Sequence, residues 1–248
     1  MIVANLATYP PREESLLQAV HAIAPQVDLV NIILNEYETV PEALNIPKVN
    51  AVIPHKDLKD TGKFYPDCTE ADYVFCFDDD IKIPGDFVSK SLNYLRKLGI
   101  SNVIGAYHGS IYEKPKFNFK RLGKYLRYTE KNIADYRRVF AFYNAQDKPV
   151  IVDQVGSGVS FMPASCYPDW SFMQGSEKFV DVRLARWAYH KGITQVTLPR
   201  ASNWLQPIRH EETIYTDFTK HNPQAVVDEI LEFAFNVRNT GEELQLSD

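Results

Sequence analysis

Three adjacent carboxylates, Asp78, Asp79 and Asp80, have the residue types and spacing in this chain that most directly indicate chemistry. They follow an apolar run, residues 73–77, that is typical of a buried strand. Neighbouring carboxylates repel one another, so a divalent cation or solvent must take up their charge. In open α/β sheets, ligands collect outside the carboxyl ends of strands, where this triplet falls. The pattern predicts a metal site, and a solvated acidic turn that caps the next helix is the alternative.

Strands and helices alternate along the chain, which favours an α/β fold with a mostly parallel central sheet flanked by helices. Strands are predicted at 2–7, 27–34, 49–53, 71–77, 102–107 and 194–198, with strand character also at 150–162. Helices are predicted at 12–24, 84–98, 179–191 and 223–237. We expect the polar tail, 239–248, to fray.

The composition is that of an ordinary globular protein, with 45% hydrophobic and 24% charged residues among 248. The formal net charge of -5 argues against a general nucleic-acid binder. The three cysteines are widely spaced, which fits reduced thiols better than a disulfide framework or a zinc site. The sequence starts without a basic leader segment and has no apolar run of roughly 20 residues, so we expect a cytoplasmic protein, soluble or peripheral at the inner face of the plasma membrane.

The first glycine of the chain is Gly62. A glycine-rich dinucleotide fingerprint or a P-loop therefore cannot follow the first predicted strand. Any phosphates bound here must be held chiefly by a metal and by cationic side chains.

Residues 110–148 differ in composition from the rest of the chain. Ten Lys or Arg stand against four acids, which gives the segment a charge of +6 and leaves -11 for the remainder. Nine aromatic residues lie in the same segment. Cationic and aromatic residues together suit an anionic partner, such as a uronic-acid polysaccharide, single-stranded nucleic acid or an anionic membrane. A mobile, solvated insertion is the alternative.

Several short motifs occur in an order that resembles one enzyme family. They are Met1-Ile-Val-Ala-Asn5, Tyr9-Pro-Pro-Arg12, Val52-Ile-Pro54, Lys56-Asp57, Lys59-Asp60-x-Gly62-Lys63-Phe64, Asp78-Asp79-Asp80-Ile81, Gly156-x-Gly158, Phe179-Val-Asp-Val-Arg183, Pro199-Arg200 and Asn203-Trp-Leu205. This set resembles the bacterial heparosan α-N-acetylglucosaminyltransferases, which build a heparin-like capsule and have a GT-A fold. The motifs span most of the chain.

The resemblance implies a retaining transfer of N-acetylglucosamine from UDP-GlcNAc to a terminal glucuronic acid, with Mn²⁺ or Mg²⁺ as cofactor. It implies one catalytic domain, 1–248, with a nucleotide-sugar half at 1–107 and an acceptor half at 108–248. The expected partners are a UDP-sugar donor and a uronic-acid-containing oligosaccharide or polysaccharide. A partner subunit of a capsule polymerase is compatible with the family, and no nucleic acid is expected.

By the same resemblance, Asp80 is the expected metal ligand, with Asp78 and His210 as further ligands. The expected donor-binding residues are Ala7, Thr8, Tyr9, Arg12, Asp57, Asp60, Lys63, Asp78, Asp79 and Arg200. The expected acceptor-binding residues are His108, Gly156, Gly158 and Trp204.

Asp181 and Arg183 are the expected catalytic residues. In a retaining enzyme Asp181 could stabilise an oxocarbenium-like centre, act as a nucleophile or position the acceptor. In an inverting enzyme it would be the general base. Arg183 and Arg200 could bind a diphosphate or the carboxylate of the acceptor.

Three other functions compete with this one. A sugar nucleotidyltransferase is expected to carry a glycine-rich loop after the first strand, which this chain lacks. A non-catalytic polysaccharide-binding scaffold would depend on 110–148 alone. Another UDP-sugar or another acceptor, including a lipopolysaccharide, would keep the same chemistry.

Overall fold

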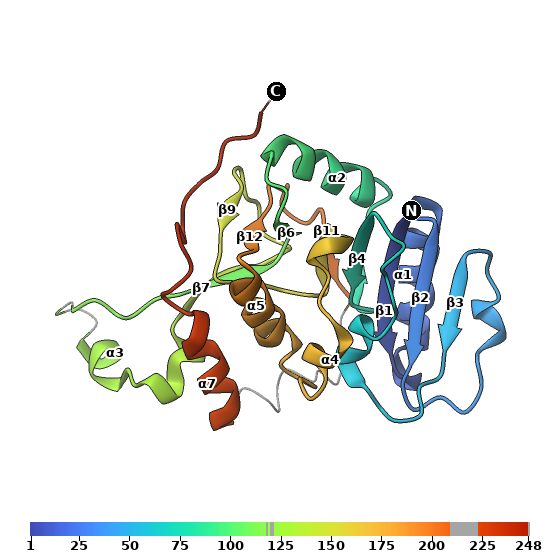
Figure 1. Ribbon diagram of the computed structural model, residues 1–248, viewed down its shortest axis with the longest axis horizontal. Coiled ribbons are helices and arrows are strands. Elements are labelled where there is room, and N and C mark those ends of the chain that lie inside the picture. The colour runs from blue at the N-terminus through green and yellow to red at the C-terminus, as the bar shows by residue number, and fades with distance from the viewer. Residues whose placement is uncertain (118, 120–121, 209–222, 248) are drawn as a thin grey trace.

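The computed structural model describes residues 1–117, 119, 122–208 and 223–247. Within these ranges, an eight-stranded sheet has the order β3-β2-β1-β4-β11-β6-β12-β9 (Figure 1). Its strands are β1 Ile2–Thr8, β2 Leu29–Leu34, β3 Val49–Val52, β4 Tyr73–Phe77, β6 Val103–Ala106, β9 Val150–Ile151, β11 Val159–Pro163 and β12 Thr194–Thr197. β3, β2, β1 and β4 are parallel, as are β6 and β12, and β11 runs antiparallel between these two groups. The prediction of an α/β fold with a mainly parallel central sheet is confirmed.

Helices cover both faces of this sheet, which explains why its central strands are buried and mostly apolar. The helices are α1 Glu13–Ile23, α2 Phe87–Leu98, α3 Leu122–Arg127, α4 Trp170–Met173, α5 Val180–Lys191 and α7 Gln224–Phe233, and a 3-10 helix, η4, spans Lys59–Phe64. Along β4, Phe75 and Phe77 belong to the core that packs against α1 and α2. Val74 and Cys76 belong to the core on the other face, under α5 and η4. The carboxyl end of β4 is thus fixed from both sides.

A second sheet carries the basic segment. It has the order β10-β7-β8, with β7 at Gly109–Tyr112, β8 at Arg137–Phe140 and β10 at Gln154–Val155. Between β7 and β8, Ile133 is fully buried in a core shared with α5 and α7. The base of this segment is therefore folded, while α3 lies at the end of the molecule opposite β3 (Figure 1).

The expectation of a fraying tail is wrong for the described residues up to 247. The N–H of Gly241 donates to the carbonyl of Ile151 at 2.8 Å, and the N–H of Leu244 donates to the carbonyl of Pro149 at 2.9 Å. The tail therefore bonds along the edge strand β9. Composition misled the prediction because these bonds use only the backbone.

The other local predictions agree closely with the structure. Gly99 and Gly192 end α2 and α5 with φ of 65° and 64°, the left-handed region that favours glycine. All three cysteines are buried and free. Among the described helices, none has both the length and the apolar character needed to cross a lipid bilayer.

Candidate active site

The loop Gly156–Gly158, between β10 and β11, joins three predicted site residues that are far apart in the sequence. The N–H of Gly156 donates to the carbonyl of His108 at 2.9 Å, and the N–H of Ser157 donates to Oδ1 of Asp181 at 2.8 Å. The carbonyl of Gly158 accepts the N–H of Asp78 at 2.9 Å. The second bond is donated by the N–H of Ser157, a residue that the sequence reasoning missed although it lies between the two predicted glycines. The loop thus connects the ends of β4 and β6 with the first turn of α5.

Both glycines of this loop are required by space. A Cβ on Gly158 would lie 1.8 Å from Oδ2 of Asp78, and a Cβ on Gly156 would lie 2.9 Å from Cδ2 of His108. These separations are far below van der Waals contact, so a side chain at either position must displace its neighbour. The Gly-x-Gly pattern therefore marks a place where the backbone lies very close to site residues.

The second and third carboxylates of the triplet share one buried arginine. Nη1 of Arg12 donates to Oδ1 of Asp79 at 3.0 Å and to Oδ2 of Asp80 at 2.6 Å. The hydroxyl of Thr8, at the end of β1, donates to Oδ2 of Asp79 at 2.6 Å. Asp79 is buried with both oxygens occupied, so it anchors Thr8 and Arg12, and the prediction that it meets the donor is not supported.

The first carboxylate of the triplet is paired with a buried lysine. Nζ of Lys63 forms an ion pair with Oδ1 of Asp78 and approaches Oγ of Ser157 at 3.4 Å. The side chain of Lys63 is only 2% exposed, whereas that of Asp78 is 43% exposed. The ammonium group therefore lies beneath the carboxylate.

Charge balance in the site explains the pKa shifts of its residues. Burial lowers the pKa of both Arg12 and Lys63, but their carboxylate partners outweigh it and the pKa of each is raised. Burial raises the pKa of Asp79 and of Asp80, and Arg12 opposes both shifts. Both cations are thus fixed in their charged form. Three carboxylates against two cations leave one net negative charge at the end of β4.

The donor set at this position fits a small divalent cation. Asp78 and Asp80 are each partly exposed, and each keeps one oxygen outside its ion pair. In the described part of the chain, no three His, Cys, Asp or Glu side chains form a preformed cluster. Mg²⁺ in proteins is commonly held by one or two carboxylates together with substrate phosphates, so two suffice.

The third predicted metal ligand, His210, lies outside the described residues. The described residues that precede His210 end at Ile208, which lies close to the acidic triplet. Ile208 donates its N–H to the carbonyl of Asp80 at 2.6 Å.

The remaining donor-side predictions divide into two groups. Asp60 lies near the site, where its Oδ1 accepts the N–H of Lys178 at 2.8 Å and burial raises its pKa to about 6. The ring of Tyr9 lies under the guanidinium of Arg12, 5.7 Å from its carbon. Asp57 instead stabilises a turn, because its carboxylate is bonded to the N–H and Nζ of Lys59.

Ala7 precedes Thr8 on β1 and contacts the loop from which Lys63 comes. A Cβ on Gly62 would lie 3.2 Å from the Cβ of Ala7. The small side chain of Ala7 thus allows η4 to approach β1 closely.

His108 lies in the same site as Asp181. Burial lowers its pKa, with Arg137 and Arg200 in the same direction, while Asp181 and Asp78 oppose this. Its Nδ1 is buried and has no hydrogen-bond partner among the described residues. A buried polar atom of this kind is a candidate contact for a bound ligand.

Arg183, predicted to be catalytic, is used to join two helices. Its Nε and Nη2 donate to the carboxylate of Glu229 on α7, with the shortest contact at 2.6 Å. Its Nη1 donates to the carbonyls of Phe172 and Gln174. The structure therefore does not bring this guanidinium to the site, because it points from α5 toward α7.

Arg200, predicted to bind the donor, is also occupied. Its guanidinium donates to the carbonyls of Ala141, Phe142 and Leu198 and to the side chain of Gln146. Burial lowers its pKa to about 10. The residue holds the end of the basic segment against β12, so the prediction of direct donor binding is not supported.

Trp204, predicted to bind the acceptor, packs in the core. Its ring stacks on Phe87 with 5.7 Å between centroids and an angle of 5°. Its Nε1 donates to Asp86 at 3.1 Å. The ring is partly buried against α2, and acceptor binding by Trp204 stays a prediction.

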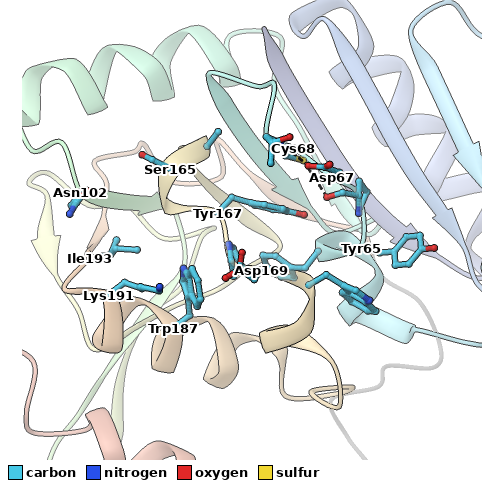
Figure 2. A pocket seen from close by; sticks show the side chains of 16 residues that line it. Tyr65, Asp67, Cys68, Asn102, Ser165, Tyr167, Asp169, Trp187, Lys191 and Ile193 are labelled. Atoms are coloured by element: carbon cyan, nitrogen blue, oxygen red, sulfur yellow. Dashed lines mark hydrogen bonds between the residues drawn. The ribbon is translucent and has the colours of Figure 1, made fainter.

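A separate cavity of about 560 Å³ lies away from these residues. Figure 2 shows its lining, which includes Tyr65, Tyr167, Asp169 and Trp187. It also contacts Asn102, just before β6, and therefore lies toward the end of the sheet where β6 begins. None of the predicted site residues lines this cavity.

Comparison with known proteins identifies the fold. The chain is similar to the crystal structure of S. aureus TarS residues 1–349 in complex with UDP-GlcNAc, with a TM-score of 0.51, 8% identity and coverage of 94% of this chain and 73% of that one. It is also similar to the crystal structure of a mycobacterial protein, with a TM-score of 0.53, 11% identity and coverage of 95% and 75%. This chain has a GT-A fold.

Likeness at such low identity shows the GT-A fold alone. In another crystal structure of the same TarS segment, the match covers 81% of this chain and 58% of that chain, at 7% identity and a TM-score of 0.48. No protein-family profile matches the chain. No curated protein sequence matches it either.

The contact between Gly158 and Asp78 predicts the effect of one methyl group. In Gly158→Ala, the new Cβ must push the carboxylate of Asp78 away from Lys63, which leaves that buried ammonium without its partner. We expect a loss of unfolding free energy of about 3 kcal/mol, measured by urea denaturation. The matched control is Gly85→Ala, where a Cβ would have nothing within 4 Å. Equal stability of the two variants would contradict this account of the loop.

The raised pKa of Asp60 predicts a pH-dependent difference in stability. Its folded pKa of about 6 lies above the ordinary value of 3.8, so the folded state holds this proton more tightly and loses stability as the pH rises between those two values. Asp60→Asn removes this loss and can still accept the bond from Lys178. Relative to the natural protein, the variant should gain on the order of 2 kcal/mol between pH 4 and pH 7 in denaturant titrations. A difference that is constant with pH would refute the raised pKa.

Proposed function

We propose that this protein is a metal-dependent glycosyltransferase that uses a UDP-sugar donor. The observation that carries the proposal is the pairing of two elements in a GT-A fold. One is the acidic triplet, compensated by Arg12 and Lys63 at the carboxyl ends of β1 and β4. The other is a second carboxylate, Asp181, held by the N–H of Ser157. TarS, with which the chain shares this fold, has been crystallised with UDP-GlcNAc.

The proposed reaction places its main electrostatic demand on the leaving group. The bond from the anomeric carbon to the diphosphate breaks, and UDP departs with the bonding electron pair. Mn²⁺ or Mg²⁺ held by Asp80 and Asp78 would supply positive charge at the diphosphate oxygens. Arg12 and Lys63 hold these two carboxylates in place through ion pairs, so little reorganisation is needed when the charge develops.

We assign to Asp181 the role of acting at the anomeric carbon of the donor sugar. Its Oδ1 accepts the Ser157 N–H at 2.8 Å, which leaves Oδ2 for the reacting centre. The residue stands in the first turn of α5, where the helix dipole favours a negative charge. His108, with its unpartnered Nδ1, lies within the electrostatic reach of Asp181 and is our candidate contact for the acceptor.

The motifs of the sequence support a narrower form of this proposal. They resemble the heparosan transferases, so we propose a retaining transfer of N-acetylglucosamine to a terminal glucuronic acid of a heparosan-like chain. A uronic acid acceptor carries a carboxylate, and residues 110–148 have a formal charge of +6, ten cations minus four acids. An anionic acceptor is compatible with this charge.

The test is a transfer assay with a panel of UDP-sugars, Mn²⁺ and an oligosaccharide that ends in glucuronic acid, followed by NMR of the product linkage. We expect transfer from UDP-GlcNAc, with loss of activity in EDTA. Asp80→Asn and Asp181→Asn should each lower kcat/KM by at least about 100-fold, because each removes charge that acts in the transition state. Circular dichroism should show an unchanged fold.

Asp67→Asn is the matched control, since Asp67 is an exposed carboxylate that lines the separate cavity. Transfer from a different UDP-sugar would retain the general proposal and correct the narrower one. If the panel gives no transfer, and polysaccharide binding is unaffected by both substitutions, the protein is a binding scaffold and the proposal fails.

A further inference from the structure

An exposed apolar cluster lies on and just before α3. This helix stands at the end of the molecule away from the main sheet (Figure 1). We call the cluster the α3 patch; its members are Phe117, Phe119, Leu122, Tyr125 and Leu126. Phe119 is 84% exposed and Leu126 is 70% exposed. The ring of Phe117 contacts those of Phe119 and Tyr125, with centroids 5.1 and 5.6 Å apart. The three rings therefore form one exposed aromatic cluster, and Leu122 and Leu126 are exposed on the same short helix as Tyr125.

The sequence that contains the α3 patch is strongly basic. The sequence from 114 to 129 contains no Asp or Glu. Lys114, Lys116 and Arg127 are exposed there. The acid just before this stretch, Glu113, is paired with Arg138 at 3.3 Å. Within the described residues, Lys114, Lys116 and Arg127 form no ion pair, so an anionic surface would meet their charges directly.

The same segment is well packed where it joins the rest of the molecule. The exposure of the α3 patch is therefore not the result of an unfolded segment. Ile133 is 0% exposed, and Tyr112 contacts Phe233 of α7 with 5.8 Å between ring centroids. The segment is thus anchored, yet it presents large apolar groups to water. Contiguous exposed apolar surface on a folded protein marks an interaction site.

We propose that the α3 patch docks on an anionic lipid bilayer. Its apolar side chains would enter the interfacial region while the surrounding Lys and Arg meet the lipid phosphates. A polysaccharide suits the observations less well, because the aliphatic side chains of Leu122 and Leu126 gain little from a hydroxyl-rich chain. The patch lies at one end of the molecule and none of its residues lines the cavity of Figure 2.

Docking in this way would orient the candidate active site. β7 begins at Gly109, the residue after His108, and its hairpin leads directly to the α3 patch. A bilayer bound at the patch would therefore be linked to the acceptor side of the site by a short, hydrogen-bonded hairpin. The inference itself does not depend on the proposed transfer reaction.

The test is co-sedimentation of the full chain with vesicles of phosphatidylcholine, with and without about 30% phosphatidylglycerol. We expect binding to the anionic vesicles alone, weakening as salt rises from about 0.1 M to about 1 M. The double variants Phe119→Ser/Leu126→Ser and Lys116→Glu/Arg127→Glu should each lower the partition coefficient at least about tenfold.

Two matched controls use exposed residues elsewhere. Val40→Ser/Ile53→Ser removes exposed apolar groups, and Lys82→Glu/Arg96→Glu reverses the same number of charges. Both controls should bind as the natural protein does. The absence of binding to the anionic vesicles, or equal loss in the controls and the patch variants, would overturn the proposal; tight binding to a soluble polyuronic acid instead would identify a polysaccharide as the occupant.

Discussion

The structure of the candidate site depends on neutralising three consecutive carboxylates at the end of β4. Two buried cations do this, Arg12 from the segment after β1 and Lys63 from η4. Neither could be buried without an anion, because the desolvation of an isolated charge costs several kcal/mol. Arg12 in turn opposes the rise that burial causes in the pKa of Asp79 and of Asp80. Strand ends and loops from three parts of the chain are therefore fixed by one charge balance, and the one negative charge left over suits a divalent cation.

The loop Gly156–Gly158 adds the second constraint, by bringing α5 to that charge cluster. Its backbone supplies the hydrogen bonds, so side-chain chemistry matters little in this loop. What the loop needs is a residue without a Cβ at positions 156 and 158. This is why Asp181 can stand beside the end of β4 although about a hundred residues separate them. The same loop holds His108 through its carbonyl, which places the start of the basic segment at the site.

Local patterns were enough to predict the strands of the main sheet, the ends of the long helices and the carboxylate cluster, but they missed β7 and β8 of the second sheet. Apolar runs bounded by glycine and proline identify buried elements directly, and Gly99 and Gly192 end their helices as expected. Side-chain destinations were harder to predict. Arg183, Arg200 and Trp204 stand within motifs, but their partners on α7, on 141–146 and on α2 come from distant parts of the chain. The sequence alone suggests that the polar tail and these arginines are exposed, because hydrogen bonds to distant parts of the chain produce no local sequence pattern.

The central claim is that the charge cluster at Asp80 and Lys63 receives the diphosphate of a nucleotide. The most direct measurement is a crystal structure of the protein with UDP and Mn²⁺. We expect the uracil and ribose at the end of β1, near Thr8 and Tyr9, with the ion between Asp80 and the diphosphate. A nucleotide bound instead in the cavity beside Trp187, with the acidic triplet away from any phosphate, would contradict it.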